Sequence, residues 1–215
     1  VSCFLDKGYE IGSVGTVMPD LEVKIGENNE ILLRGKTITT GYYKKPEATA
    51  AAIDKDGWFH TGDAGYLKGN HLYLTERIKD LFKTSNGKYI SPQALETKLS
   101  IDRYIDQIAV IADQRKFVSA LIVPVYGLVK NYAKEKGLEY KDMADLLQHP
   151  KVQALFRARI DTLQQQFAHY EQVKRFTLLS EPFSMERGEL TNTLKLKRSV
   201  VAKNYKELID KMYEE

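Results

Sequence analysis

The stretch LTERIKDLFKTSNGKYISPQALE, residues 74–96, determines how the chain divides. It opens at the end of a short apolar run, Leu72–Leu74, which is typical of a strand, and continues with closely spaced charges. Asn86-Gly87 predicts a tight hairpin turn, because both residue types tolerate positive φ. Ser91 followed by Pro92 predicts a helix start, since Ser is a good N-cap and Pro suits the first helical position. These signals indicate a junction between two bodies, although on pattern alone a charged surface hairpin between two packed elements is the favoured interpretation.

The residues before the junction favour a β-rich body. Short apolar segments separated by Gly, Pro and Asn predict strands at Val14–Val17, Leu21–Ile25 and Glu30–Arg34. Pro46–Ile53 predicts a short helix with Pro in its first turn. We expect a small antiparallel sheet or barrel whose remaining partners lie upstream of Val1.

The residues after the junction mix helices and strands, so the predicted fold class is α+β. Gln107–Ala112 and Val118–Val125 are β-branched runs that predict adjacent strands, and Val152, Phe156, Ile160 and Phe167 fall on one helical face. The remaining predicted elements are helices at Gln93–Leu99, Leu128–Lys136 (ended by Gly137) and Lys141–Leu147, a strand at Phe176–Leu179, and a final helix from about Leu196 with Val201, Tyr205, Leu208 and Met212 as its apolar stripe.

Composition excludes several classes of protein. Lys and Arg total 32 against 29 Asp and Glu, a net charge of +3, which is too balanced for a basic nucleic-acid surface. The single cysteine, Cys3, cannot form an internal disulfide and fits a reducing compartment such as the cytoplasm. No apolar run is long enough to span a bilayer. The chain opens at Val1 without an initiator Met and in the middle of a pattern, so we expect a fragment of a longer protein.

The segment GWFHTGDAG, residues 57–65, holds the first candidate site residue. Asp63 has two interpretations: a turn residue that caps its own backbone, or a carboxylate that binds the two hydroxyls of a ribose through its two oxygens. His60 has no second His, Cys or carboxylate at metal-ligand spacing, so we interpret it as a packed or surface histidine.

Two further segments carry cationic candidates. Arg77 follows a predicted strand and offers a planar fork to phosphate or ribose, or alternatively a surface ion pair with Glu76 or Asp80. The segment GELTNTLKLKR, residues 188–198, is either a plain loop entering the last helix or a mobile loop that presents one Lys to an anionic transition state.

Four segments in this order resemble the adenylate-forming superfamily, which includes acyl-CoA synthetases, luciferases and adenylation domains. RGKTITTGYYKKPEAT resembles the family's Gly-Tyr and Pro-Glu-x-Thr segment, and GWFHTGD its ribose-binding motif. ERIKDLFKTSNGKYISP is similar to the hinge motif, and LTNTLKLKR to the C-terminal lysine motif, of the long-chain fatty acyl-CoA synthetases. The resemblance runs over nearly the whole chain.

The resemblance implies roles for nucleotide-binding and catalytic residues. Asp63 would bind the ribose hydroxyls of ATP and of the acyl-adenylate, Leu74 would lie against adenine, and Arg77 would contact ribose and phosphate. Lys195 matches the catalytic lysine of adenylation; Lys197, two positions on, is the alternative. Leu194 stands where the motif usually has Gly.

The resemblance also implies roles in a second step. Lys79 matches the hinge about which the C-terminal domain swings between two catalytic conformations. Asn86, Gly87 and Lys88 match the loop presented to the thioester-forming site, where Asn86 replaces the first of two glycines. Because Asn tolerates left-handed conformations, we expect the turn to survive.

The function implied is that of the C-terminal part of an ATP-dependent long-chain fatty acid–CoA ligase. Residues 1–76 would be the distal β-rich part of the N-terminal AMP-binding domain, and residues 77–215 the mobile C-terminal domain. Fatty acid, ATP and CoA are the expected substrates, with Mg²⁺ held in the missing upstream part and no metal site in this fragment. Because the phosphate-binding loop and the acyl pocket are also absent, we expect the fragment alone to be inactive.

Two other functions remain open at this level. One is transfer of the acyl group to a carrier protein, and the other is a non-catalytic α+β interaction module. A fatty substrate is compatible with peripheral membrane contact by a cytoplasmic enzyme, although the Val152–Phe167 stripe is more simply a core-facing helix.

Overall fold

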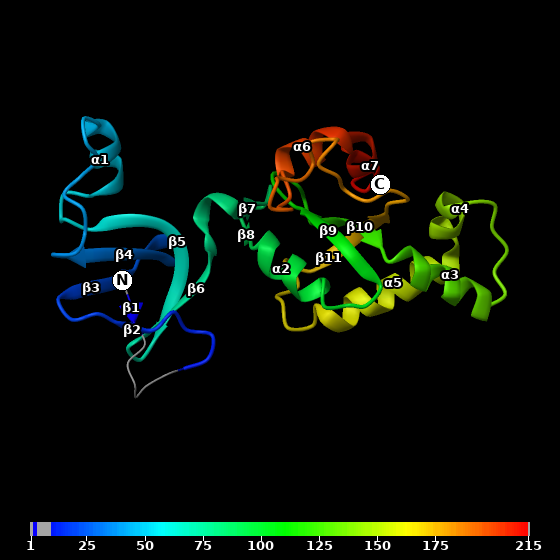
Figure 1. Ribbon diagram of the computed structural model, residues 1–215, viewed down its shortest axis with the longest axis horizontal. Helices are drawn as coiled ribbons and strands as arrows, with labels where there is room; N and C mark the ends of the chain where they lie inside the picture. Colours follow the sequence, from blue (N-terminus) through cyan, green and yellow to red (C-terminus); the bar gives the residue numbers. More distant parts are fainter. Residues whose placement is uncertain (1, 4–9, 215) are drawn as a thin grey trace. The chain divides into compact units, whose positions relative to one another are not determined.

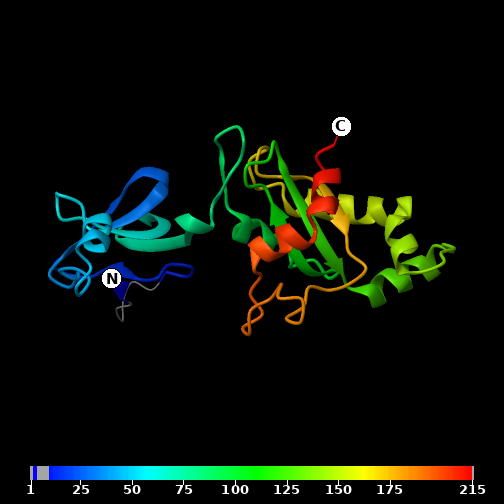
Figure 2. The ribbon, with the colours of Figure 1, turned by 90° about the horizontal axis from the view of Figure 1, so that it is seen from above.

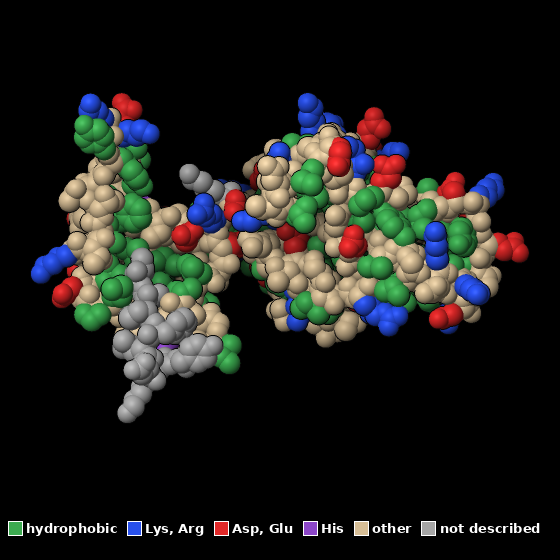
Figure 3. Space-filling model, viewed as in Figure 1, with side chains coloured by type: hydrophobic (Ala, Val, Ile, Leu, Met, Phe, Trp, Pro, Cys, Tyr) green, Lys and Arg blue, Asp and Glu red, His purple; other side chains and the backbone are tan. Residues whose placement is uncertain are grey.

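The structure, a computed structural model, describes residues 2–3 and 10–214, and its internal contacts divide into two units, 1–81 and 82–215 (Figure 1). The division falls after Leu81, whereas the boundary predicted from the sequence follows Glu76. On the visible face, acidic and basic side chains are interspersed, as the balanced composition indicates (Figure 3). Within the described residues, no helix is long and apolar enough to cross a membrane.

The first unit is built on a six-stranded antiparallel sheet in the order β1-β2-β6-β5-β4-β3 (Figure 1). β3 also contacts β2, so the sheet is nearly closed, as the predicted barrel-like body requires. Its core gathers Leu21, Ile31, Leu33 and Leu72. The elements are β1 (Ser2–Cys3), β2 (Thr16–Val17), β3 (Leu21–Ile25), the 3-10 turn η1 (Glu27–Asn29), β4 (Glu30–Gly35), α1 (Pro46–Ala52), β5 (Phe59–Lys68), β6 (His71–Arg77) and the 3-10 turn η2 (Ile78–Asp80).

β5 is the main element that the sequence did not predict. Its ten residues include the polar, Gly-rich segment HTGDAG, which has the composition of a turn. The strand forms because β4 and β6 pair with it on both sides, and its register shifts beside Glu30 and between Ala64 and Gly65 absorb the irregular backbone.

The second unit wraps helices around a three-stranded sheet in the order β11-β10-β9. β10 runs antiparallel to β9 and parallel to β11. The elements are the hairpin strands β7 (Phe82–Lys83) and β8 (Tyr89–Ile90), then α2 (Pro92–Leu99), β9 (Ile105–Ile111), β10 (Val118–Pro124), α3 (Tyr126–Glu135), α4 (Met143–Gln148), α5 (Pro150–Leu163), β11 (Val173–Leu178), α6 (Arg198–Asn204) and α7 (Lys206–Lys211). The α+β fold class is therefore confirmed.

The central strand β10 is buried along its whole length because both faces of this sheet are covered. Val118, Ala120 and Ile122 join the core that includes α2 and α5, whereas Leu121 and Val123 point into the core beneath α6 and α7. Figure 1 shows α6 and α7 above the sheet and α2 and α5 below it. The alternation follows from the two-residue period of a strand.

The start of α2 and the end of α3 lie where the local sequence signals predicted them. Ser91 caps α2 by accepting a hydrogen bond from the Ala94 amide at 3.1 Å, and Pro92 is its first residue. Gly137 follows α3 with φ +60°. Two helices differ from prediction: α5 ends at Leu163, so Phe167 packs on the core from beyond the helix, and the final helix is broken at Tyr205 into α6 and α7.

Candidate functional site

The backbone around Asp63 is shaped by its neighbours rather than by its own carboxylate. Gly62 adopts φ +70°, and the Thr61 hydroxyl donates to the Ile31 carbonyl at 2.7 Å and accepts from the Asp63 amide at 3.1 Å. Glu30 accepts the Gly62 amide at 3.0 Å. The interpretation of Asp63 as a residue that caps its own turn is therefore wrong, because Thr61 makes that bond and Asp63 lies within β5.

Asp63 and Arg77 face each other across the β5–β6 ladder. They are directly paired in the register, and the Arg77 Nε lies 3.4 Å from Asp63 Oδ1. Arg77 thus pairs with Asp63 rather than with Glu76 or Asp80, the partners considered from the sequence. The Asp63 side chain remains 36% exposed. One carboxylate oxygen at the ion pair leaves the second able to accept hydrogen bonds from a ligand.

Asp63 and Leu74 line the same cavity. It has a volume of about 230 Å³ and apolar walls from β4 and β6, completed by Thr61. Leu74 is half exposed, which is unusual for a large apolar side chain beside a core and gives a ligand an apolar surface. The lining residues are Val14, Ile31, Leu33, Thr61, Asp63, Leu72 and Leu74. Two residues predicted from separate segments, Asp63 and Leu74, therefore line one cavity, and Arg77 joins them through its ion pair with Asp63.

The predicted hinge residue lies in a short irregular connection. Lys79 belongs to the 3-10 turn η2, which the Leu81 amide closes onto the Ile78 carbonyl at 3.2 Å. The side chain of Lys79 lies outside the described part of the structure. Connections of this kind between regular elements are where hinges occur in proteins.

The predicted hairpin forms around Asn86, Gly87 and Lys88. Thr84 closes it: its amide donates to the Lys88 carbonyl at 2.9 Å, and its hydroxyl accepts from the Lys88 amide at 3.1 Å. The turn therefore survives with Asn86 in place, and its left-handed position is Gly87, with φ +75°, rather than Asn86. The Lys88 ammonium lies 5.6 Å from the ring centroid of Tyr170, a cation–π distance.

The second loop carries Lys195 at an exposed turn ahead of α6, in the orange segment of Figure 2. Leu190 and Leu196 form an isolated antiparallel bridge, and Thr191 closes the turn. The Thr191 hydroxyl accepts the Lys195 amide at 3.0 Å, and the Thr191 amide donates to the Lys195 carbonyl at 2.8 Å. Lys195 therefore projects from a tight, closed turn rather than from an open loop.

Leu194 adopts a left-handed backbone, φ +59°, directly before Lys195. This conformation disfavours residues with a Cβ, which explains why Gly is the usual residue at this point of the motif. Lys197 has a different structural position from Lys195. It is the N-cap residue of α6, and its amide donates a hydrogen bond to the Glu189 carbonyl at 2.8 Å.

Glu189 was missed by the sequence analysis. It is only 1% exposed, and its carboxylate accepts hydrogen bonds from Ser184, Arg187 and Asn204. Burial by itself raises the pKa of Glu189, but the hydrogen bonds from these partners outweigh it and hold the pKa below its usual value. A lone Glu in a charged loop has no sequence signal that separates it from a solvated residue, because one of its partners, Asn204, comes from the separate helix α6.

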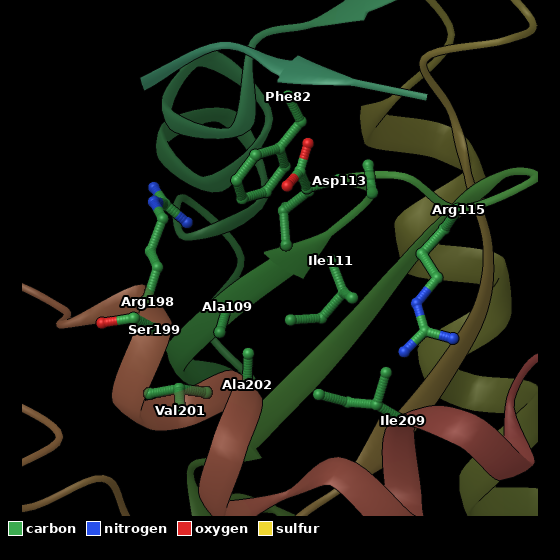
Figure 4. A pocket seen from close by; sticks show the side chains of 12 residues that line it. Phe82, Ala109, Ile111, Asp113, Arg115, Arg198, Ser199, Val201, Ala202 and Ile209 are labelled. Carbon is green, nitrogen blue, oxygen red and sulfur yellow. The ribbon is translucent and has the colours of Figure 1, made fainter. Parts of the chain in front are cut away.

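A cavity of about 330 Å³ in the second unit contains none of the predicted site residues (Figure 4). Its floor is apolar, from β9, α6 and α7, and Arg115 and Arg198 stand at its sides. Arg198 is paired with Glu96 at 2.5 Å and Arg115 with Asp210 at 2.8 Å, so each guanidinium already has a carboxylate partner.

His60 has carboxylate neighbours but no metal-ligand set. Its Nδ1 lies 2.9 Å from Glu30, and its Nε2 lies 3.7 Å from Asp54. The half-exposed ring is a packed histidine, as interpreted from the sequence. Among the described residues, no three His, Cys, Asp or Glu side chains are grouped to hold a metal ion.

Comparison with known proteins identifies the family. The family model of the AMP-binding enzyme C-terminal domain matches residues 79–215, which is more than half of the chain and includes the whole second unit. The chain belongs to the AMP-binding enzymes. The resemblance to the adenylate-forming superfamily is thereby confirmed.

Curated relatives of the chain are long-chain acyl-CoA synthetases. It is 34% identical over 232 residues to the peroxisomal long chain acyl-CoA synthetase 6 of Arabidopsis thaliana, covering 98% of the chain and 33% of that protein. It is 35% identical over 197 residues to the long-chain-fatty-acid–CoA ligase 5 of Rattus norvegicus, covering 88% of the chain and 28% of that protein. The chain spans about a third of the length of the curated relatives it matches.

Solved structures show the same fold. The adenylation domain of a carboxylic acid reductase from Segniliparus rugosus, in complex with AMP and a co-purified carboxylic acid, matches with a TM-score of 0.64 and 26% identity. The match covers 86% of this chain and 28% of the other.

Proposed function

We propose that this chain is the C-terminal part of an ATP-dependent long-chain fatty acid–CoA ligase. The observation that carries the proposal is that Asp63 and Leu74 line one small cavity of the first unit, while Arg77 pairs with the Asp63 carboxylate. The curated relatives, which are long-chain acyl-CoA synthetases, support the substrate class. Activity requires the rest of the protein that the longer relatives contain.

In the first half-reaction a fatty acid carboxylate oxygen attacks the α-phosphorus of ATP. The bond to the β-phosphate breaks, pyrophosphate leaves and an acyl-adenylate forms. Asp63 accepts hydrogen bonds from the ribose hydroxyls, Leu74 contacts adenine, and Arg77 contacts ribose and phosphate. Lys195 stabilises the negative charge that develops at the reacting phosphate and carboxylate, an electrostatic contribution that is often the largest in catalysis.

In the second half-reaction the CoA sulfur attacks the acyl carbonyl, AMP leaves and the thiol proton is lost to solvent. The second unit would turn about Lys79, withdrawing Lys195 and presenting the Asn86–Lys88 hairpin. The exposed hairpin and the exposed Lys195 turn are separate projections of the second unit, which supports an exchange of one for the other (Figure 2).

Mg²⁺ would be held outside this chain. The described residues contain no cluster that fits a metal ion, so no step is assigned to it here. The proposed location is the cytoplasm, and peripheral membrane contact remains a prediction.

The test uses the full-length protein with ATP, palmitate and CoA. Pyrophosphate release reports the first half-reaction, and acyl-CoA formed from supplied acyl-adenylate reports the second. Lys195→Ala should slow adenylation by about 10²–10³-fold, the usual loss for one stabilising donor, and leave the second step nearly unchanged. An equal loss in both steps would contradict the role of Lys195.

Lys197→Ala is the matched control, because the two lysines are both exposed and two residues apart. Its side chain makes no capping hydrogen bond to α6, so we expect adenylation within about twofold of wild type. A selective loss in this variant instead would transfer the catalytic role to Lys197.

A carrier protein is the second candidate acceptor. One matched structure is the adenylation and carrier didomain of a carboxylic acid reductase, at 26% identity. Assays with free CoA and with a phosphopantetheine-bearing carrier protein separate the two acceptors. Product formed on CoA supports the ligase assignment. Product formed only on the carrier protein would replace it with an enzyme that transfers the acyl group to a carrier protein.

A further inference from the structure

The turn that carries Lys195 has few apolar anchors of its own. Residues 192–195 are exposed, and the turn closes through Thr191. Burial begins where the loop returns to the domain, at Glu189 and Leu190 on one side of the turn and, in part, at Leu196 on the other, where it packs on the same core as Leu190. The position of Lys195 therefore depends on what fixes these three residues.

Glu189 is fixed through both its backbone and its side chain. Its amide donates to the Ser184 carbonyl at 3.0 Å, and its carbonyl accepts from Lys197, on the far side of the Lys195 turn, at 2.8 Å. Both strands of the loop therefore meet at this residue.

The buried carboxylate joins the loop that precedes it to α6. Its Oε2 accepts the Ser184 amide at 3.0 Å, at the start of the loop, and its Oε1 accepts the Asn204 side-chain amide at 3.2 Å, from α6. Arg187 pairs with it from within the loop at 3.0 Å and also contacts Glu181 and the Pro182 carbonyl. Each oxygen is thus matched to donors, which a buried charge requires.

We propose that Glu189 is a positioning residue, which fixes the Lys195 turn for acyl-adenylate formation by tying both strands of the loop to α6. This proposal rests on the proposed function of Lys195. Glu189 contacts no substrate and acts only through the turn.

A general contribution to stability does not account for this arrangement equally well. A buried ion pair adds little net stability compared with apolar residues of the same volume, because desolvation offsets the attraction. Its directional hydrogen bonds instead specify one loop conformation. Replacing one oxygen by an amide, as in Glu189→Gln, sets an NH₂ donor against the donors of Ser184, Arg187 or Asn204 and forces the loop to shift.

The experiment compares the two half-reactions in the full-length protein. Glu189→Gln should slow adenylation by up to about 10²-fold, since displacements near 1 Å cost that much, with little change in the KM for ATP. Thioester formation from supplied acyl-adenylate should stay within about twofold of wild type. Equal losses in both half-reactions, or no loss, would overturn the proposal.

Asp102→Asn is the matched control. Asp102 is also a buried carboxylate, with a side chain 6% exposed, and it pairs with Arg159 at 2.7 Å in the same unit but away from the loop. Its replacement should change stability without changing the ratio of the two half-reaction rates. A ratio that shifts as much as in Glu189→Gln would show that any lost buried ion pair has this effect, and would overturn the proposal.

A double-mutant cycle separates action through Lys195 from independent action. In the Lys195→Ala background, Glu189→Gln should cause no further loss of adenylation, because the side chain it positions is gone. Losses that multiply would overturn the proposal. If Glu189→Gln does not fold, Asn204→Ala removes one donor at an exposed helical position and should give a smaller but equally selective loss.

Failure of the proposed function gives a different result. In that case wild-type protein forms no acyl-adenylate from ATP and a fatty acid. Failure of the Glu189 proposal alone leaves wild-type and Lys195→Ala behaviour as expected and removes only the selective effect of Glu189→Gln.

Discussion

Asp63 and Lys195 are positioned by two different kinds of structure. Asp63 lies within a ladder of backbone hydrogen bonds between β4, β5 and β6, where the register fixes its partner Arg77. Lys195 projects from a turn that is tied to its domain by the buried carboxylate of Glu189. A strand ladder tolerates a changed side chain, but not an added atom in the space that a neighbouring backbone occupies. A side-chain network, in contrast, fails when a single polar atom is changed.

The largest expected effect tests the ladder. Gly65 lies at the register shift of β5, where an added Cβ would come within 2.2 Å of the Tyr73 carbonyl oxygen and 2.7 Å of Ile31. Gly65→Ala should therefore destabilise the first unit by about 3 kcal/mol or more, as expected for overpacking against rigid backbone. Urea denaturation of the full-length protein measures it.

Gly127→Ala is the control for this prediction. Gly127 lies in α3 with no atom within 4 Å of the added Cβ, so the change should be neutral or stabilising by up to about 1 kcal/mol. If Gly65→Ala is equally harmless, the ladder is not what holds Asp63 in place.

A smaller effect is expected when only the side chain in the ladder changes. Asp63→Asn keeps the shape but removes the charge and one acceptor, so nucleotide affinity should fall about tenfold, as hydrogen bonds to charged groups predict. Stability should stay within about 0.5 kcal/mol, because the side chain is partly exposed. Calorimetric titration with AMP, beside a denaturation curve, measures both. Loss of stability with unchanged affinity would give Asp63 a structural role instead.

The smallest expected effect concerns the Lys195 turn. Leu194→Gly relieves the left-handed backbone at a side chain that is 67% exposed, but increases the freedom of the unfolded chain. The two effects nearly cancel, so we expect a gain of at most about 1 kcal/mol. A clear loss, measured by thermal denaturation, would show that Leu194 makes a contact that stabilises the turn.

Local signals and non-local pairing were predictable to different degrees. The cap at Ser91, the turn at Gly87 and the stop at Gly137 depend on residues adjacent in sequence, and all three were predicted. β5 was not, because its strand conformation comes from partners on both sides. The break at Tyr205 was also missed, since the spacing of the predicted stripe, Val201, Tyr205, Leu208 and Met212, fits one continuous helix.

The sequence by itself determined the α+β fold class, the approximate division of the chain and the motifs that place it among the AMP-binding enzymes, since these depend on short-range patterns. The tertiary structure alone decided that Asp63 and Leu74 share one cavity, that Arg77 pairs with Asp63, and that Glu189 ties the Lys195 turn to α6. The physical reason is that burial and partner choice are set by segments far apart in the chain. A charged residue reveals its role only when those segments come together.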